Sequence, residues 1–224
     1  MTSNVLVVTG FVPITNHPRA ASTYHELGRH LTGIKQAPVQ VFQHALDDTW
    51  LCRLIENYPL PITHAIADNP AKNTLAYHCV QHQKTAWMVE GARLRPDADV
   101  IVWIDYGILH LPDVTVALID NMLARARAEA QIAIPGCWPT TNLERIDLSY
   151  PCWRFCGGAV ICHREHVERF HQMVREDVED RIRSTGHVSW EVNTWARVEA
   201  RRQLPIRWYA ADHNSTMFTG YESP

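Results

Sequence analysis

The sequence lacks the features by which several large classes of protein are recognised. No apolar run approaches the roughly 18 residues that a membrane-spanning helix requires, so we expect no transmembrane segment. The N-terminus has neither a basic segment nor a long apolar one, so we expect no signal peptide. From the cysteines, which read as reduced thiols, we expect a cytoplasmic protein. The formal net charge is −3, which provides no overall basic surface for nucleic acid.

The motifs that mark zinc ribbons and phosphate-binding loops are missing as well. The six cysteines form no Cys-x-x-Cys pair, and we expect reduced, mostly buried thiols. No Gly-x-Gly-x-x-Gly follows the first predicted strand, and no Gly-x-x-x-x-Gly-Lys-Ser/Thr occurs anywhere. Dinucleotide-binding dehydrogenases and P-loop ATPases are therefore disfavoured, and any phosphate groups would be held by a metal ion and by side chains.

What the sequence does contain is a regular alternation of strand-like and helix-like segments. Strands are expected at residues 4–9, 39–42, 62–66, 100–104, 132–134, 155–161 and 205–209. Helices are expected at residues 20–33, 73–95, 165–184 and 189–202, with others beginning at Asp48 and at Pro112–Asp113. This alternation predicts a single α/β domain over residues 1–224, a three-layer sandwich with a mainly parallel central sheet. The connection 136–153 is unusually long and is a candidate functional loop.

The run from Val100 to Gly107 contains the strongest candidate for a functional residue. Five apolar residues, typical of a buried parallel strand, end abruptly in Asp105. In open α/β sheets, ligands bind just beyond the carboxyl ends of strands, so Asp105 can hold a cation or a polar ligand there. The alternative is a turn, because Asp-x-Gly is common turn chemistry.

Lys84 lies on the buried stripe of the predicted helix 73–95. From Lys84 to Leu94 the helix advances about 15 Å at ~1.5 Å per residue. The strand from Val100 to Asp105 returns about 17 Å at ~3.3 Å per residue. If helix and strand are antiparallel neighbours, Lys84 and Asp105 lie at the same height. The alternative is that Lys84 reaches solvent or pairs with a structural acid.

Other residues are expected to reach the same edge of the sheet. Gly157 and Gly158 leave space at the start of their strand, for the close approach of a ligand or for a bulge. His213 follows the last strand as Asp105 follows its own, and both side chains are ligands for Mn²⁺-like cations. His78 and His82 share one helix face, where we expect solvent rather than a metal ion.

Four motifs in order resemble those of a known family: Trp103–Gly107, Phe155–Gly158, Trp190–Trp195 and Asp212–Asn214. Over nearly the whole chain, their order and spacing resemble the HtrL/YibB-like family of bacterial glycosyltransferase-like proteins. More distantly they are similar to the GT-A glycosyltransferases, including the glycogenin-like and fungal galactosyl/mannosyltransferase groups. The resemblance implies a GT-A-like fold and a nucleotide-sugar donor bound across the first strand. It places Thr9 and the following loop, with Arg19, near the base and ribose.

The resemblance also implies roles for the remaining candidates. Asp105 and His213 would hold Mn²⁺ or Mg²⁺ against the donor diphosphate, which Lys84 would approach. The sugar or the acceptor would pass Gly157 and Gly158. Glu191 and Asn193 would face the reacting sugar as the catalytic pair. The family pattern has a second acid where this sequence has Gly107, so the metal site would need His213 and the donor phosphates to complete it.

These residue types suit metal-assisted glycosyl transfer, in which a leaving diphosphate must be neutralised. By analogy with the glycogenin-like groups, we expect retention of the anomeric configuration rather than inversion. Two alternatives remain. One is a non-catalytic nucleotide-sugar-binding protein on a degenerate transferase fold, and the other is a nucleotidyltransferase that uses nucleoside triphosphates. The acceptor (a glycan, lipid-linked sugar, protein or modified nucleic acid) and the oligomeric state stay open.

Overall fold

The computed structural model describes residues 4–15, 19–64, 70, 73–126, 131–139 and 150–222. The strands are β1 (Val5–Phe11), β2 (Val39–Gln43), β3 (Thr63–His64), β4 (Val100–Ile104), β5 (Ile132–Gly136), β6 (Ala159–His163), β7 (His187–Val188) and β8 (Ile206–Ala210). The α-helices are α1 (Ala21–Leu31), α2 (Trp50–Glu56), α3 (Leu75–Leu94), α4 (Val116–Arg125), α5 (Arg164–Thr185), α6 (Glu191–Ala200) and α7 (Thr216–Thr219). Two 3-10 turns, η1 (Leu46–Asp48) and η2 (Ile108–His110), complete the described elements.

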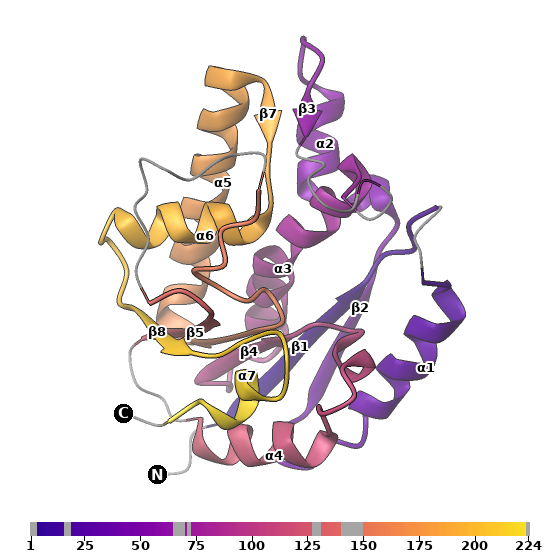
Figure 1. The fold of residues 1–224 in the computed structure, drawn as a ribbon, viewed down its shortest axis with the longest axis vertical. Coiled ribbons are helices and arrows are strands. Elements are labelled where there is room, and N and C mark those ends of the chain that lie inside the picture. Colours follow the sequence, from indigo (N-terminus) through magenta and orange to yellow (C-terminus); the bar gives the residue numbers. More distant parts are fainter. Residues whose placement is uncertain are drawn as a thin grey trace.

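The centre of the molecule is a six-stranded sheet in the order β2-β1-β4-β6-β5-β8 (Figure 1). The pairs β2–β1, β1–β4 and β5–β8 are parallel, whereas β6 is antiparallel to both of its neighbours. Five strands therefore run one way and β6 runs the other. The predicted α/β class with a mainly parallel sheet is confirmed.

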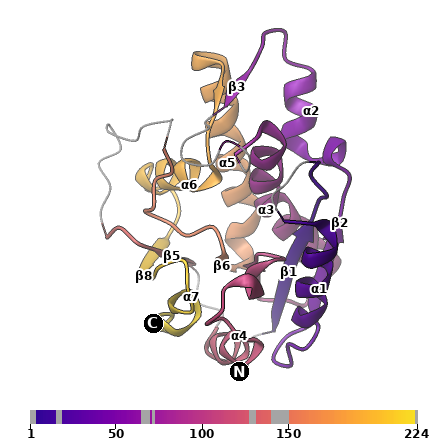
Figure 2. The same cartoon turned by 45° about the vertical axis from the view of Figure 1, so that its right-hand side comes forward.

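Helices cover both faces of this sheet, as the three-layer prediction required (Figures 1 and 2). On one face, α3, α5 and α6 pack against alternate strand residues such as Leu6, Val8 and Trp103. On the other face, α1, α4 and α7 pack against the intervening residues, such as Val7 and Val102. Because successive side chains of a strand point to opposite faces, strands buried on both faces are apolar throughout, as β4 is.

The direction of β6 determines what gathers at one edge of the sheet. Ile104, the last residue of β4, pairs with Ala159, the first residue of β6. The Gly157–Gly158 pair that precedes β6 therefore lies beside Asp105, which follows β4, and the Asp105 N–H donates to the Gly158 carbonyl at 3.0 Å. The carboxyl ends of β1, β5 and β8 reach the same edge. A parallel β6 would have placed the two glycines at the opposite edge.

Several predicted boundaries differ from the structure. The strand expected at 155–161 begins only at Ala159, and the one expected at 62–66 is the two-residue β3, paired with β7 in a separate small sheet. Residues 65 and 66 and most of the long connection 136–153 lie outside the described residues. The helix expected from Pro112–Asp113 starts at Val116, because the Thr115 side chain caps it by accepting from the Leu118 N–H.

Two smaller predictions were wrong. Asp48 does not cap α2; it lies in η1, and Thr49 occupies the N-cap position. His78 and His82 do not face solvent but are almost fully buried. The His82 Nε2–H donates to the Ser189 carbonyl at 3.0 Å, and the His78 ring lies 5.5 Å from that of Trp190. Helix α3 is covered on this side by the segment that leads into α6, which a helix pattern read in isolation does not reveal.

Candidate functional site

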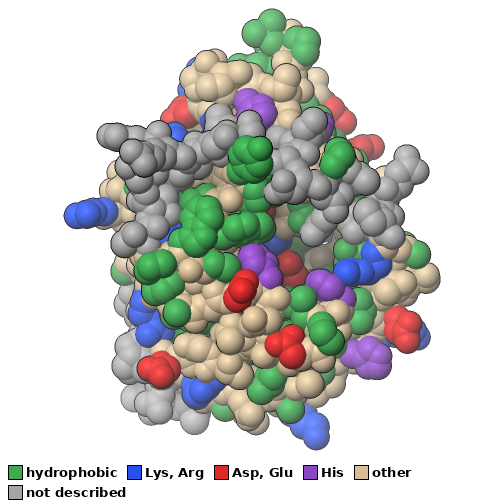
Figure 3. All heavy atoms as spheres, viewed as in Figure 1, with side chains coloured by type: hydrophobic (Ala, Val, Ile, Leu, Met, Phe, Trp, Pro, Cys, Tyr) green, Lys and Arg blue, Asp and Glu red, His purple; other side chains and the backbone are tan. Residues whose placement is uncertain are grey.

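A cavity of about 410 Å³ opens at the carboxyl ends of β1 and β4. In the space-filling view this face is hollowed near its centre, with acidic and basic side chains visible inside the hollow (Figure 3). Its described walls come from the end of β1 and the following loop (10–14), from the region of α1, from α3, and from the segment after β4. They are lined by Gly10, Phe11, Val12, Pro13, Ile14, Arg19, Ala21, Tyr24, Tyr77, Val80, Gln81, Lys84, Trp87, Trp103, Asp105, Tyr106, Gly107 and His110.

Lys84 connects three segments at the floor of this cavity. Its ammonium group contacts Asp105 Oδ1 at 3.0 Å, Glu191 Oε1 at 2.9 Å and the Gly157 carbonyl oxygen at 2.9 Å. An ammonium has three N–H donors, so these three acceptors use all of them. The predicted equal height of Lys84 and Asp105 is confirmed. Glu191 joins the pair from the start of α6.

The electrostatics of this cluster keep Lys84 and Glu191 charged. Burial alone would lower the pKa of Lys84, but the carboxylates of Asp105 and Glu191 outweigh it and raise that pKa. Burial alone would raise the pKa of Glu191, but the Lys84 ammonium outweighs it and lowers that pKa. One ammonium against two carboxylates leaves one net negative charge at the cavity floor.

Asp105 is held in a fixed orientation through one of its two carboxylate oxygens. Its Oδ1 accepts from Lys84 and from the Trp103 indole N–H at 3.0 Å, and the side chain is 36% exposed. Among the described residues, Oδ2 accepts no hydrogen bond. Trp103 was missed in the sequence, although a residue two positions before Asp105 on a strand lies on the same face.

Tyr24 and Arg19 occupy the place where the family pattern has a second acid. A Cβ built at Gly107 would lie 2.5 Å from Tyr24 Cε1 and 3.6 Å from Arg19 Nη1. The Arg19 guanidinium lies 5.1 Å from the centroid of the Tyr24 ring. A side chain at position 107 would collide with Tyr24, and the Arg19 guanidinium lies beside that position.

The space beside the two glycines of the 157–158 pair is filled by protein side chains. A Cβ at Gly157 would lie 2.2 Å from Glu191 Oε1 and 2.9 Å from Lys84 Nζ. A Cβ at Gly158 would lie 2.9 Å from the sulfur of Met217. The close approach that glycine allows here is that of the Lys84–Glu191 pair.

Thr9, Asn193 and Glu191 do not line the cavity in the part of the chain that the structure describes. Thr9 is fully buried in β1, although the loop after it forms a wall. The Asn193 amide oxygen accepts from the Cys152 N–H at 2.6 Å, and its NH₂ donates to the Tyr150 carbonyl at 2.9 Å. Asn193 thus fixes the segment before β6, and Glu191 lies behind Lys84.

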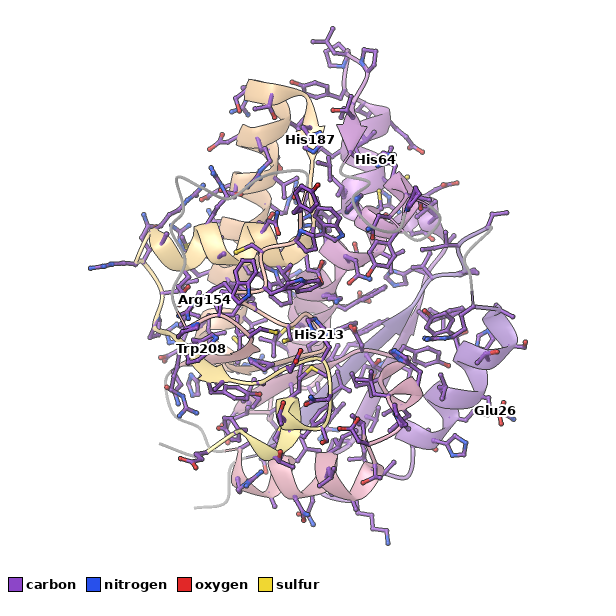
Figure 4. The ribbon with its side chains drawn as sticks, in the orientation of Figure 1. Glu26, His64, Arg154, His187, Trp208 and His213 are labelled. Carbon is purple, nitrogen blue, oxygen red and sulfur yellow. The ribbon has the colours of Figure 1, made fainter. Side chains whose placement is uncertain are left out.

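His213 lies on the segment after β8, near the centre of the view in Figure 4. Its ring packs edge-on against Trp153, with the centroids 4.4 Å apart, and its Nδ1 is 3.4 Å from Asp212 Oδ1. Within the described residues it forms no hydrogen bond or ion pair with Asp105. The shared metal site of Asp105 and His213 stays a prediction. Two residues that the sequence did not single out, Cys137 and Cys156, lie beside His213 instead.

No protein-family model and no curated protein matches the sequence. In structure, the chain is similar to a glycosyltransferase involved in the glycosylation of the major capsid of PBCV-1. The TM-score is 0.49 and the identity 14%, over 93% of this chain and 82% of that one. Because one α/β fold hosts many chemistries, this similarity carries no argument about activity. The HtrL/YibB-like resemblance stays a prediction. No helix in the described ranges is both long and apolar enough to cross a membrane.

Proposed function

We propose that this protein is a glycosyltransferase that moves a sugar from a nucleotide-sugar donor to an acceptor hydroxyl. The observation that carries the proposal is the Lys84–Asp105–Glu191 cluster at the floor of a cavity at the carboxyl ends of β1 and β4. That edge is where open α/β sheets bind nucleotides. A volume of about 410 Å³ falls within the roughly 300–1,000 Å³ of small-ligand sites.

The charge of the cavity floor favours a divalent cation, Mn²⁺ or Mg²⁺, as cofactor. A net negative floor repels a diphosphate, and a cation bound to both would reverse that repulsion. Asp105 Oδ2 fits this task, since it accepts no hydrogen bond among the described residues and its carboxylate is already oriented. When bound, the cation would supply charge neutralisation of the leaving diphosphate.

The protein side chains would divide the remaining work. Lys84 has no N–H donor left for a substrate, so it acts through Asp105, whose position it fixes, while Glu191 holds Lys84 in place. Arg19, which lines the cavity beside position 107, would contact a phosphate oxygen. The rings of Tyr24 and Tyr106 offer apolar walls for a base or sugar.

We further propose retention of the anomeric configuration. Inversion in one step needs a general base beside the acceptor hydroxyl. Asp105 is the one carboxylate among the residues described as lining the cavity, and its Oδ1 is held by Lys84 and by the Trp103 indole N–H. His110, which also lines the cavity, donates its Nδ1–H to the Gly107 carbonyl at 2.6 Å. A paired, oriented carboxylate is a cation ligand rather than a proton acceptor.

Binding of nucleoside diphosphates tests the proposal. With Mn²⁺ present, at least one of UDP, GDP, ADP and CDP should raise the thermal midpoint, because a ligand that binds only the folded state stabilises it. Asp105→Asn should abolish the Mn²⁺-dependent part of that shift. Glu26→Gln, an exposed carboxylate on α1 that points away from the molecule in Figure 4, should leave it unchanged. No shift with any of the four nucleotides would refute the proposal.

The alternative of a non-catalytic donor-binding protein rests on Gly107. Because Tyr24 excludes a second acid, the cation would have fewer protein ligands than the family pattern provides. The two functions differ in turnover. A transferase moves the sugar of its donor at least slowly to water and so releases nucleoside diphosphate, whereas a binding protein does not. Measuring that release with the donor that matches the tightest nucleotide separates them.

A further inference from the structure

Two thiols and an imidazole converge beside the candidate site from three separate segments. Cys137 follows β5, Cys156 precedes β6 and His213 follows β8. The two sulfurs are 3.7 Å apart, and His213 Nδ1 lies 3.9 Å from Cys137 Sγ and 4.0 Å from Cys156 Sγ. All three ligand atoms lie within 4.8 Å of one another.

These spacings are close to the edges of a tetrahedral zinc site. With Zn–S near 2.3 Å and Zn–N near 2.0–2.1 Å, tetrahedral angles give ~3.8 Å between two sulfurs and ~3.6 Å between sulfur and nitrogen. The observed sulfur–sulfur distance already matches. The imidazole would have to move inward by only a few tenths of an ångström, and its side chain is 42% exposed.

Asp212 lies next to two of the three and is the candidate fourth ligand. Asp212 Oδ1 is 3.5 Å from Cys137 Sγ and 3.4 Å from His213 Nδ1. The same oxygen accepts from the His213 backbone N–H at 2.7 Å, and Trp153 packs against the imidazole ring. The ligand atoms are therefore partly oriented before any cation arrives, which is what a metal site needs from its surroundings.

We propose that Cys137, Cys156 and His213 bind a zinc-class divalent cation, with Asp212 completing the coordination. Binding releases the two thiol protons to solvent, since the thiolate is the ligand. Two thiolates and an imidazole select a softer ion than Mg²⁺ or Mn²⁺, which prefer oxygen ligands. This site is distinct from the cation site proposed at Asp105, and in it His213 shares a cation with the two thiolates instead of with Asp105.

The site would fix the position of Lys84. The residue after Cys156 is Gly157, whose carbonyl oxygen accepts from the Lys84 ammonium at 2.9 Å. A cation that ties together the ends of β5, β6 and β8 therefore also fixes the third acceptor of Lys84. In this way the thiolate site supports the geometry of the Lys84–Asp105 pair without contacting a substrate.

Cobalt absorption tests the proposal. The full-length protein, stripped of metal under reducing conditions, should bind one equivalent of Co²⁺ with thiolate-to-metal charge-transfer absorption, and Zn²⁺ should displace it. Cys137→Ser, Cys156→Ser and His213→Asn should each weaken binding by more than about 100-fold, because even outer-shell partners typically cost 10–100-fold. His213→Asn is the decisive variant, because an exposed side chain can change without loss of folding.

The controls separate this site from other thiols and from the proposed function. Cys52→Ser changes a half-buried thiol elsewhere, beside Asp47 and Glu56, and should leave the absorption intact. Asp105→Asn should also leave it intact, whether or not nucleotide binding is lost. Absence of the charge-transfer band, or a band that survives both Cys137→Ser and Cys156→Ser, would overturn the assignment.

Discussion

At the scale of single residues, Lys84 is the side chain on which the site depends most. It is 4% exposed, and it is the cation that pairs Glu191, which is 6% exposed. Replacing it by Met leaves a buried carboxylate without a counter-charge, a change that typically costs about 3–5 kcal/mol. Lys84→Met should therefore lower the free energy of unfolding by about that amount near neutral pH, measured by urea denaturation.

The pH dependence of this effect has a definite sign. The lowered pKa of Glu191 means that its stabilising contribution is present above the unfolded value of 4.5 and is lost as the pH falls below it. The raised pKa of Lys84 means that its contribution is present below 10.5 and is lost as the pH rises above the folded value. The contribution of this pair to the free energy of unfolding of the wild type should therefore be constant from about pH 5.5 to about pH 8.

Lys84→Met should behave differently over the same range. Its unpaired Glu191 takes up a proton on folding, so the variant should become more stable as the pH falls from about 8 to about 5.5. The double variant Lys84→Met/Glu191→Gln removes the buried charge and should recover part of the loss at the higher pH. Equal destabilisation at both pH values, with no recovery in the double variant, would show that Glu191 is not the buried charge.

The residues of the site differ in how far the sequence predicts them. Lys84 and Asp105 could be placed together because helix α3 and strand β4 are consecutive, and the rise per residue fixes their relative height. Cys137, Cys156 and His213 could not be placed together in this way. The two cysteines are 19 residues apart and Cys156 and His213 are 57 apart, and no single helix or strand spans either interval. Convergence of that kind depends on strand order, which is set by tertiary packing.

At the scale of elements, α3 and β1 fit together through two glycines. A Cβ at Gly91 on α3 would lie 2.5 Å from Val8 Cγ2, and a Cβ at Gly10 on β1 would lie 2.5 Å from the Trp87 ring. Each glycine thus receives a large side chain of the other element. This close approach determines how far Lys84, one turn before Trp87, stands from Asp105.

Gly91→Ala should therefore disturb both stability and the site. The added methyl overpacks the interface, which typically costs about 1–3 kcal/mol, while alanine favours the helix by about 1 kcal/mol. We expect a net loss of up to about 2 kcal/mol in the free energy of unfolding, together with weaker nucleotide binding. Denaturation and nucleotide titration measure the two effects.

A compensating substitution makes the test specific to this contact. Val8→Ala removes the methyl groups that the new Cβ would meet, so Gly91→Ala/Val8→Ala should be less destabilised than the sum of the two single variants. Simple additivity would contradict the contact between these two residues.

The direction of β6 is the element-scale feature that the sequence could not supply. Its apolar residues predict a buried strand, but a buried strand has the same apolar pattern whichever way it runs in the sheet. The prediction that Gly157–Gly158 reaches the edge with Asp105 is right only because β6 runs opposite to β4. The long connection before β6 leaves room for either direction.

At the scale of the whole molecule, apolar burial is unevenly distributed. The two large clusters on the faces of the six-stranded sheet contain most of the buried side chains. The third cluster, formed by Leu51, Cys79, Val178, Ile182 and Val188, is much smaller and joins α2, α3, α5 and β7. The β3–β7 pair stands at the top of Figure 1. His64 and His187, labelled in Figure 4, mark these two short strands, which pair in parallel.

This distribution predicts two levels of stability within one chain. Regions with few buried apolar contacts open locally, whereas a strand buried on both faces exchanges its amide hydrogens only on global unfolding. The amide of Thr63, which donates to the Gly186 carbonyl at 2.9 Å, should therefore exchange much faster than that of Val102 in β4. Gly91→Ala should accelerate exchange at Val102 by the full loss of global stability and leave Thr63 unchanged. Hydrogen exchange resolved by residue measures both amides in one experiment, and a joint response would mean that the β3–β7 pair unfolds together with the sheet.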